Sequence, residues 1–400
     1  MPGFEMFGGK ERAEVQDVLD SGVLMRYGFD GMRNGHWKAR ELERKLAERM
    51  QTQYAQLVSS GTAALTVALA SAGVGAGDEV ILPTFTFVAS FESVLALGAI
   101  PVLTDIDDTL TLDPKAIEKA ITPRTKAVMP VHMCGSMADL RAIKDICDRH
   151  AILLIEDACQ AIGGSFEGKP LGSYGDIGCF SFDFVKTITC GEGGGLITNN
   201  EVFYKNADHF SDHGHDHIGK DRGAESHPFL GYNYRISELH AAVGLAQIPR
   251  LDNFLEIQEK HYTQLKEAID PIEGITFRRV PVGGVQNYSF LNFFLPTEDQ
   301  AREAQKELVA AGVDACFYWY DNNWHYHKKW EHLKGQKSLG ALSESVNEGL
   351  KKQNNTDFTA SDHWMGRTVS CLIKLSWTPE EVAARALKMA AVLQKVLRSS

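Results

Sequence analysis

The stretch that decides the fold is "CFSFDFVKTITCGEGGGLITNN", residues 179–200. Short apolar runs at 177–183 and 194–200 flank a loop that holds a single lysine, Lys186, among aromatic residues, small hydroxyls and glycines. Runs this short and this apolar are typical of strands that are buried on both faces of a sheet. A lone ammonium group in such a loop is either solvated or a reactive amine, and the residues that surround it in the fold decide which.

The same pattern extends from residue 55 to about residue 200, where short apolar runs alternate with amphipathic segments. Strands are predicted at 55–60, 79–86, 100–107, 125–132, 151–157, 177–183 and 194–200. Helices are predicted between them at 60–73, 87–99 and 137–150. Strands that alternate with helices form a mostly parallel sheet with helices on both faces, so we expect an α/β domain with about seven strands.

The remainder of the chain has a different pattern of predicted helices and strands. The first 50 residues indicate two helices that are separated by an irregular stretch at 25–37. Beyond residue 250 a strand is predicted at 289–296, and helices are predicted at 251–269, 297–312 and 378–397. We therefore expect two domains: a large α/β domain over residues 1–250 and a smaller α+β domain over residues 251–400.

The composition argues against several classes of protein. The chain has 400 residues, 44% of them hydrophobic, and a formal net charge of −11, so nucleic acid and anionic membranes are not expected as main partners. It has seven cysteines, and no CxxC pair occurs, which argues against a disulfide framework or a structural zinc site. We find no signal-peptide pattern and no apolar run of about 18 residues, so a cytoplasmic location without a membrane span is expected.

Several polar and aromatic residues follow the predicted strands at the edge where parallel α/β sheets bind their ligands. Asp157 ends a very apolar strand, and Gly61 and Thr62 begin a helix directly after another strand. Ser181 ends a third strand, and Phe87 follows a fourth. Each has a plainer interpretation when taken alone: a helix cap or ion pair for the aspartate, an N-cap turn for the glycine and threonine, and core packing for the phenylalanine.

Together with Lys186, these residues have the chemical groups that one cofactor requires. A helix N-terminus binds phosphate, a desolvated lysine is a usable amine nucleophile, and a carboxylate keeps a pyridine nitrogen protonated. Together these groups are the parts of a site for pyridoxal 5'-phosphate. The glycines after Lys186 do not form a dinucleotide-binding fingerprint, because no helix follows them at the required spacing.

At this point the sequence resembles a known family, the DegT/DnrJ/EryC1/StrS sugar aminotransferases. The resemblance rests on "SSGTAAL" (59–65), "GAGDEVILPTFTFVAS" (75–90), "IEDACQAIGG" (155–164), "GDIGCFSFDFVKTITCGEGGGLITN" (175–199) and "GYNYRISELHAAVGLAQ" (231–247). It implies a fold-type-I, aspartate aminotransferase-like enzyme that binds pyridoxal 5'-phosphate. It also implies a homodimer with shared active sites.

The resemblance also assigns roles to single residues. Lys186 matches the lysine that forms the Schiff base, and Asp157 matches the partner of the pyridinium nitrogen. Gln160 matches the residue that binds the ring hydroxyl, and Phe87 matches the aromatic residue that stacks on the ring. The phosphate contacts are implied to be Gly61, Thr62, Ser181 and, from the other subunit, Asn233.

The reaction that the resemblance implies is amino transfer. Some family members carry histidine in place of the lysine and act as dehydratases, whereas this chain has Lys186. The amino donor is expected to be L-glutamate and the acceptor a keto or aldehyde sugar. A lyase or desulfurase that uses the same cofactor is the alternative from another class, and a non-catalytic regulator is disfavoured because no added DNA-binding segment is visible.

Three stretches depart from the family's pattern, at 21–43, 213–227 and 318–332. Arg26 and Arg33 in the first stretch are candidates to hold a substrate carboxylate, with a solvated loop as the alternative. The resemblance further implies an acidic acceptor sugar, 3,8-dideoxy-8-oxo-D-manno-octulosonate of lipopolysaccharide synthesis, which such arginines would suit, with a nucleotide-linked 4-keto-6-deoxyhexose as the alternative. The alternating histidines of the second stretch lack a fixed metal-ligand spacing, so no metal site is expected.

Overall fold

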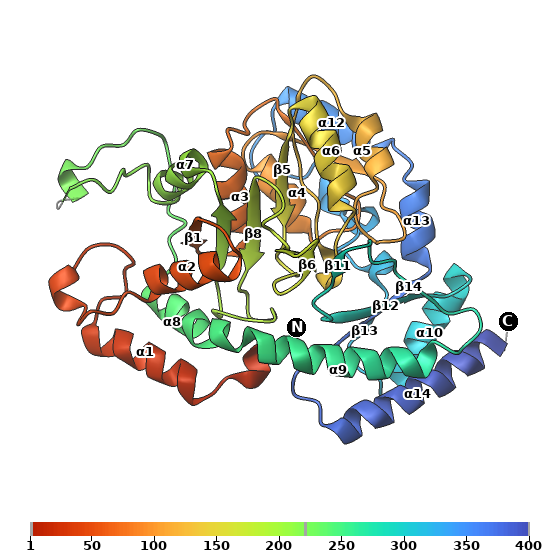
Figure 1. The fold of residues 1–400 in the computed structure, drawn as a ribbon. Helices are drawn as coiled ribbons and strands as arrows, with labels where there is room; N and C mark the ends of the chain where they lie inside the picture. Colours follow the sequence, from red (N-terminus) through yellow and green to blue (C-terminus); the bar gives the residue numbers. More distant parts are fainter. Residues whose placement is uncertain (1–2, 220–221, 399–400) are drawn as a thin grey trace.

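The centre of the fold is a seven-stranded sheet in the order β1-β9-β8-β5-β4-β2-β3 (Figure 1). The computed structural model describes residues 3–219 and 222–398. Only β9 runs against its neighbours, so the sheet is mostly parallel, as predicted. The strands lie where the sequence predicts them: β1 (Tyr54–Val58), β2 (Glu79–Pro83), β3 (Ile100–Thr104), β4 (Thr125–Val128), β5 (Leu153–Asp157), β8 (Ile177–Ser181) and β9 (Gly194–Thr198).

Helices bury both faces of this sheet, which explains why its strands are continuously apolar. On β2, Val80 and Leu82 are buried with the residues of α3 and α4, whereas Ile81 is buried on the other face with those of α5 and α6. The helices on or beside these faces are α2 (Lys38–Arg49), α3 (Gly61–Ser71), α4 (Val88–Leu95), α5 (Pro114–Ala120), α6 (Leu140–His150), α7 (Glu201–Ser211) and α8 (Glu238–Gln247).

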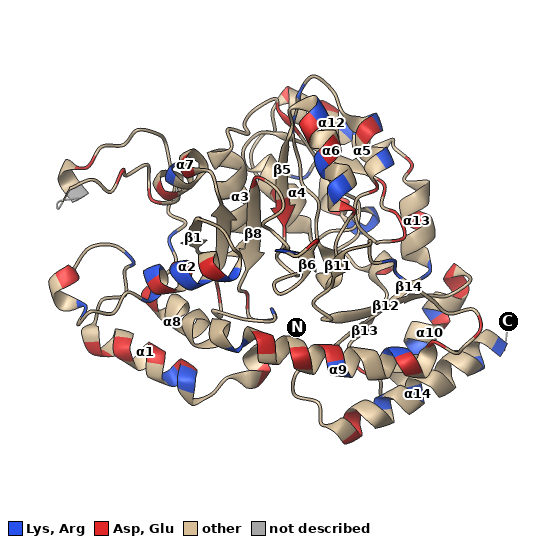
Figure 2. Cartoon of the chain, in the orientation of Figure 1, with Lys and Arg blue, Asp and Glu red and all other residues tan. Residues whose placement is uncertain are grey.

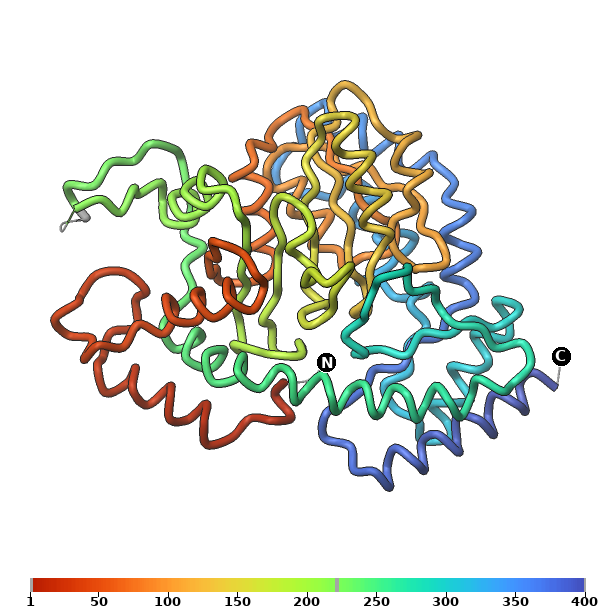
Figure 3. The backbone as a smooth tube through the Cα atoms, in the orientation of Figure 1, coloured from red at the N-terminus to blue at the C-terminus, as the bar shows by residue number. Residues whose placement is uncertain are grey.

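Two long connections leave the large domain on one side (Figure 3). The first spans residues 22–37, between α1 (Gly9–Ser21) and α2, and corresponds to the predicted irregular stretch. The second spans residues 212–237, between α7 and α8. Since α8 packs against both α1 and α2, the N-terminal helices and this second connection form one unit with the sheet.

The second sheet has four antiparallel strands and belongs to the C-terminal part of the chain. Leu265, Phe293, Leu308 and Met389 are buried between this sheet and its helices. The predicted strand and the three predicted helices are confirmed. The elements are α9 (Leu251–Ile269), β10 (Thr276–Phe277), β12 (Phe290–Phe294), α10 (Glu298–Ala310), β13 (Cys316–Phe317), β14 (Thr368–Leu372) and α14 (Pro379–Arg398).

A segment of the C-terminal part returns to the large domain. Trp330, Val346 and Leu350 are buried in the same core as α3 and α4. This segment contains α11 (Glu331–Lys334), α12 (Glu344–Asn354) and α13 (Thr359–Gly366), and a small sheet joins β6 (Ser165–Phe166) and β7 (Lys169–Pro170) to β11 (Gly284–Val285). The division of the chain into 1–250 and 251–400 stays a prediction, because the two parts exchange these elements.

Charged residues lie mainly on the outer helices, and the central strands carry few of them (Figure 2). This distribution follows from the cost of burying unpaired charge. In the described ranges 3–219 and 222–398, no helix has the length and apolarity that crossing a membrane requires.

Candidate active site

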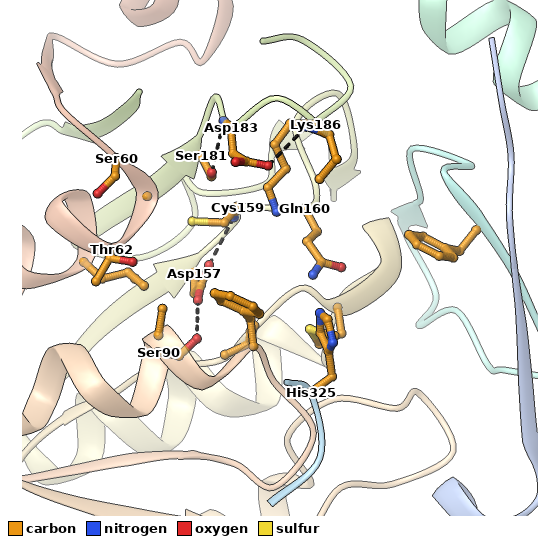
Figure 4. A pocket seen from close by; sticks show the side chains of 18 of the residues that line it. Ser60, Thr62, Ser90, Asp157, Cys159, Gln160, Ser181, Asp183, Lys186 and His325 are labelled. Carbon is orange, nitrogen blue, oxygen red and sulfur yellow. Dashed lines mark hydrogen bonds between the residues drawn. The ribbon is translucent and has the colours of Figure 1, made fainter. Parts of the chain in front are cut away.

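A cavity of about 440 Å³ lies at the carboxyl ends of β5 and β8, beside the N-terminus of α3 (Figure 4). The C-terminal part closes it with Phe290, Phe317, Trp319 and His325. All but one of the residues predicted to bind the cofactor line this cavity: Gly61, Thr62, Phe87, Asp157, Gln160, Ser181 and Lys186. The fold therefore brings together residues that are far apart in sequence.

The start of α3 forms a seat for an anion. The hydroxyl of Ser60 caps the helix by accepting a hydrogen bond from the Ala63 N–H, at 3.0 Å. The N–H groups of Gly61 and Thr62 precede the first donor of the helix ladder, the Ala64 N–H, which bonds to the Ser60 carbonyl, so they have no partner within the helix. With the Thr62 and Ser181 hydroxyls in the same cavity, these donors fit a phosphate group.

Close backbone packing holds this seat in place. A Cβ atom on Gly61 would lie 2.7 Å from the Ser181 Cβ, so only glycine fits between α3 and β8. A Cβ atom on Gly194 would lie 2.1 Å from the carbonyl oxygen of Ser60. The glycines after Lys186 thus let β9 pass directly behind the anion seat.

Replacing Gly194 with alanine is expected to lower the free energy of unfolding by about 1–3 kcal/mol, because the new methyl group forces Ser60 out of position. Affinity for pyridoxal phosphate should fall with it. Urea unfolding and a cofactor titration measure the two effects. Gly9→Ala is the control, because a Cβ atom there meets nothing within 4 Å. Equal stability of the two variants would contradict this account of the seat.

Asp157 ends β5 with its carboxylate turned into the cavity, and the residue is only 3% exposed. Its Oδ2 accepts a hydrogen bond from the Ser90 hydroxyl at 2.7 Å, and its Oδ1 accepts one from the Cys159 N–H at 3.1 Å. The Ser90 hydroxyl lies in turn 2.7 Å from the Thr86 hydroxyl. These neutral donors orient the carboxylate and leave it facing the space that a ring nitrogen would occupy.

Lys186 lies in the loop between β8 and β9, and its side chain points into the cavity (Figure 4). The loop is held by its backbone: the Lys186 N–H donates to the Asp183 carbonyl at 3.0 Å, and the Lys186 carbonyl accepts from Gly3 at 2.8 Å. No ion pair to this lysine occurs in the described part of the chain. The amine is therefore presented to the cavity by the loop and is not engaged in a surface salt bridge.

Two further residues complete the walls. Phe87 lies just before α4, and its ring stacks on Trp324 with the centroids 5.6 Å apart. The Gln160 Oε1 accepts a hydrogen bond from the Cys134 N–H at 2.9 Å. Because a backbone N–H can only donate, this contact identifies the amide oxygen and leaves the Gln160 NH₂ group as a donor to the cavity.

The sequence did not single out several other residues that line the cavity. Ser90 lies one helical turn after Phe87, and Trp319 and His325 belong to the stretch 318–332, which departs from the family's pattern and is rich in aromatic residues and histidines. That unusual content was the available signal. The lining residues without a predicted role include Ser60, Ser90, Cys159, Asp183, Glu192, Trp319 and His325.

Asn233 is the one predicted cofactor contact that lies outside this cavity. It pairs with Asp212 in an isolated bridge, and its Oδ1 accepts a hydrogen bond from the Arg235 N–H at 3.4 Å. Its role toward the other subunit stays a prediction.

The two arginines lie outside this cavity in the described chain. Arg26 is buried, donates to the Leu57 carbonyl at 2.7 Å and pairs with Glu43 at 2.6 Å. Arg33 is 1% exposed, donates to backbone carbonyls of its own loop and has its guanidinium group 3.8 Å from the centre of the Trp37 ring. The Arg26 guanidinium group joins the 22–37 connection to the body of the protein, and that of Arg33 lies 3.5 Å from Glu238 of α8. A substrate contact for either residue stays a prediction.

His217, in the stretch 213–227, packs against the 22–37 connection. His217 donates to Asp208 at 2.7 Å and to Asp212 at 3.0 Å, and its ring stacks on Tyr27 with the centroids 4.1 Å apart. His215 pairs instead with Glu225 at 2.9 Å. Among the residues that the structure describes, no group of three or more His, Cys, Asp or Glu side chains is arranged to hold a metal ion.

The stability of the protein is expected to fall between about pH 6.5 and pH 9 because of His217. Burial lowers the pKa of His217, but its hydrogen bonds to Asp208 and Asp212 outweigh burial and raise it to about 9. A pKa that is higher in the folded state gives stability below the unfolded value, and this stability is lost as the pH rises through the folded value. We expect a loss of about 2 kcal/mol after allowance for solvent screening.

Urea unfolding across this pH range measures the effect. The difference in the free energy of unfolding between the wild type and His217→Gln should shrink as the pH rises. A constant difference would contradict a charged His217.

Comparisons with known proteins agree with this geometry. The sequence pattern of the DegT/DnrJ/EryC1/StrS aminotransferase family matches residues 7–383. The chain is 34% identical over 365 residues to the 3-amino-5-hydroxybenzoate synthase of Amycolatopsis mediterranei (strain S699), which covers 90% of each chain. It is 39% identical over 302 residues to the GDP-perosamine synthase of Escherichia coli O157:H7, with 75% of this chain and 79% of that enzyme covered. It is 42% identical over 260 residues to the L-glutamine:2-deoxy-scyllo-inosose aminotransferase of Streptomyces kanamyceticus, with 63% of this chain and 60% of that enzyme covered.

Solved structures share the fold over almost its whole length. The 3-amino-5-hydroxybenzoic acid (AHBA) synthase has a TM-score of 0.81 at 30% identity, with 97% of each chain covered. NtdA from Bacillus subtilis, solved with bound cofactor PMP, has a TM-score of 0.80 at 27% identity, with 99% of this chain and 84% of that chain covered. The predicted fold-type-I architecture is therefore confirmed.

Proposed function

The chain belongs to the DegT/DnrJ/EryC1/StrS aminotransferase family, whose members depend on pyridoxal phosphate, and from this premise we propose that it transfers an amino group from L-glutamate to a keto or aldehyde sugar. The observation that carries the proposal is that the Lys186 amine and the Asp157 carboxylate line the same cavity, beside the N-terminus of α3.

The residues of the cavity fit the cofactor. The free N–H groups of Gly61 and Thr62 suit its phosphate, and the NH₂ group of Gln160 suits its ring hydroxyl. Asp157 suits the ring nitrogen, and Phe87 offers an apolar face to the ring. Pyridoxal phosphate, when bound, supplies a ring that accepts electrons from the substrate carbon.

Lys186 has two tasks in this proposal. Its Nζ would hold the aldehyde of the cofactor, and the same Nζ would carry a proton to and from the substrate carbon. Asp157 would keep the ring nitrogen protonated. Ser90 and Cys159 keep this carboxylate in one orientation through their hydrogen bonds.

A homodimer with shared active sites is part of the proposal. Val185, which lines the cavity, and its neighbour Phe184 are each 52% exposed although both are apolar. The charged groups of the described lining are one lysine and three carboxylates, those of Asp157, Asp183 and Glu192, so an anionic substrate needs donors from elsewhere. A second copy of the chain that covers this side would supply them, and sedimentation of the purified protein measures the assembly.

The proposal also names the acceptor sugar. We favour 3,8-dideoxy-8-oxo-D-manno-octulosonate, which would place the enzyme in lipopolysaccharide synthesis. The support is the unusual stretch 318–332, which contributes Trp319 and His325 to the cavity. The alternative is a nucleotide-linked 4-keto-6-deoxyhexose, supported by the similarity to a GDP-perosamine synthase.

The test begins with the protein loaded with pyridoxal phosphate. Addition of L-glutamate, or of L-glutamine in a parallel sample, should bleach the visible absorption and release the corresponding keto acid. Each of the two acceptors is then added, and the aminated sugar is identified by its mass. Release of pyruvate or sulfide without a keto acid from the donor would overturn the proposal in favour of a lyase or desulfurase.

A further inference from the structure

His325 enters the active-site cavity from the C-terminal part of the chain, and its position is tied to that of Phe87. Its carbonyl accepts a hydrogen bond from the Thr86 N–H at 3.0 Å, and the Trp324 carbonyl accepts one from the Val88 N–H at 2.8 Å. The His325 ring packs against Phe87 and Trp319, with centroids 5.3 Å and 4.4 Å away. The imidazole is therefore a fixed part of the wall that flanks the cofactor's predicted stacking residue.

The hydrogen bonds around Asn322 determine which nitrogen of His325 carries the proton. The Asn322 Oδ1 accepts a hydrogen bond from the Trp324 N–H at 2.9 Å, so this atom is the amide oxygen. The same oxygen lies 3.0 Å from the His325 Nδ1. Since a carbonyl oxygen only accepts, Nδ1 carries the proton and Nε2 carries a lone pair.

The Nε2 atom has no hydrogen-bond partner within the described residues, although the ring lines the cavity. Burial, together with the nearby charge of Lys186, lowers the pKa of His325 to about 3. A group this weakly basic does not take a proton from substrate at neutral pH, but its lone pair still accepts a hydrogen bond. The role open to it is recognition of a donor group.

We propose that His325 determines acceptor specificity by accepting, at Nε2, a hydrogen bond from the sugar hydroxyl next to the carbonyl that is aminated. This inference rests on the proposed function and deepens it. A sugar brings such a hydroxyl to the cavity, whereas glutamate has none. Among the other polar groups of the cavity, the Asp157 oxygens and the Gln160 oxygen already accept hydrogen bonds.

The first test separates the two halves of the reaction. His325→Ala should raise KM for the sugar about tenfold, because one hydrogen bond to the sugar is lost. The rate of reaction with glutamate should stay unchanged. The probe is whichever of the two proposed acceptors gives the higher kcat/KM. For the analogue of this acceptor that lacks the neighbouring hydroxyl, kcat/KM of the wild type should be about tenfold lower than for the full acceptor. The variant should have the same kcat/KM for the analogue and for the full acceptor. His332→Ala is the control, because His332 is 45% exposed and pairs with Glu92 outside the cavity.

The second test addresses the tautomer. Asn322→Asp places a carboxylate against Nδ1 and favours the protonated imidazole, which turns Nε2 from an acceptor into a donor. KM for the sugar should then rise as the pH is lowered from about 8 to about 6, while the wild type stays flat over this range. A merely structural role for Asn322 would raise KM equally at each pH.

The outcomes distinguish this inference from the proposed function. If glutamate bleaches the wild type and His325→Ala leaves the sugar KM unchanged, or slows the glutamate reaction equally, the inference fails and the proposed function stands. If no turnover occurs, binding of the octulosonate is followed by the fluorescence of Trp319 and Trp324, which flank His325. Equal affinity of the wild type and the His325→Ala variant in that titration would overturn the inference independently.

Discussion

Replacing Lys186 with alanine is expected to lower the rate of amino transfer by about 10⁴-fold or more, because one side chain both binds the cofactor and moves the proton. No other lysine or arginine among the described residues lines the cavity. The loss is measured as keto acid formed from glutamate. The variant should still bind pyridoxal phosphate, since the anion seat at Gly61 and Thr62 is unchanged.

A covalent assay checks the same residue independently of turnover. Borohydride reduction of the loaded wild type, followed by peptide mapping, should label Lys186, and the alanine variant should yield no labelled peptide. Lys10→Ala is the matched control, because Lys10 is exposed on α1 and does not line the cavity. A label on another lysine of the wild type would remove the basis for the proposed function.

Asp157→Asn is expected to lower the rate of the glutamate reaction by about 10²- to 10³-fold, because the neutral amide no longer stabilises a protonated ring nitrogen. The substitution preserves size, so the acceptors for Ser90 and Cys159 are partly retained and the fold should survive. Single-turnover bleaching by glutamate measures the effect. The absorption spectrum of the bound cofactor should also shift, which a purely structural loss would not cause.

The control for this variant is Asp113→Asn, which makes the same chemical change at the N-cap of α5, where the Asp113 side chain accepts from the Lys115 N–H. Asparagine also caps helices, so this variant should keep full activity. A rate for Asp157→Asn within about twofold of the wild type would contradict the role of the carboxylate.

The large sheet could be predicted because its signals are local. Each strand is a short apolar run, and the order of strand and helix along the chain follows from these runs. The strands β13 and β14 were not predicted: β13 has two residues, and β14 (Thr368–Leu372) mixes polar and apolar residues although it is almost wholly buried. Its burial depends on pairing with β12 and β13, which no local pattern reports.

The contacts of Arg26 and Arg33 could not be predicted for a related reason. A basic loop near a predicted site looks the same in sequence whether its guanidinium groups bind substrate or the protein itself. Glu43 and the Leu57 carbonyl engage Arg26, and the 22–37 connection with Trp37 engages Arg33. These partners become visible only when the connection is folded.

By itself, the sequence determined the α/β fold, the edge of the sheet that binds ligand, and the place of Lys186, Asp157 and the start of α3 at that edge. These depend on residues within a few positions of a strand end, where side-chain period and backbone direction are set locally. Only the tertiary structure decided which charges are already paired, that Ser90 orients Asp157, and that His325 presents an unprotonated Nε2 to the cavity. Such contacts join side chains from distant segments, and their geometry depends on how whole elements pack.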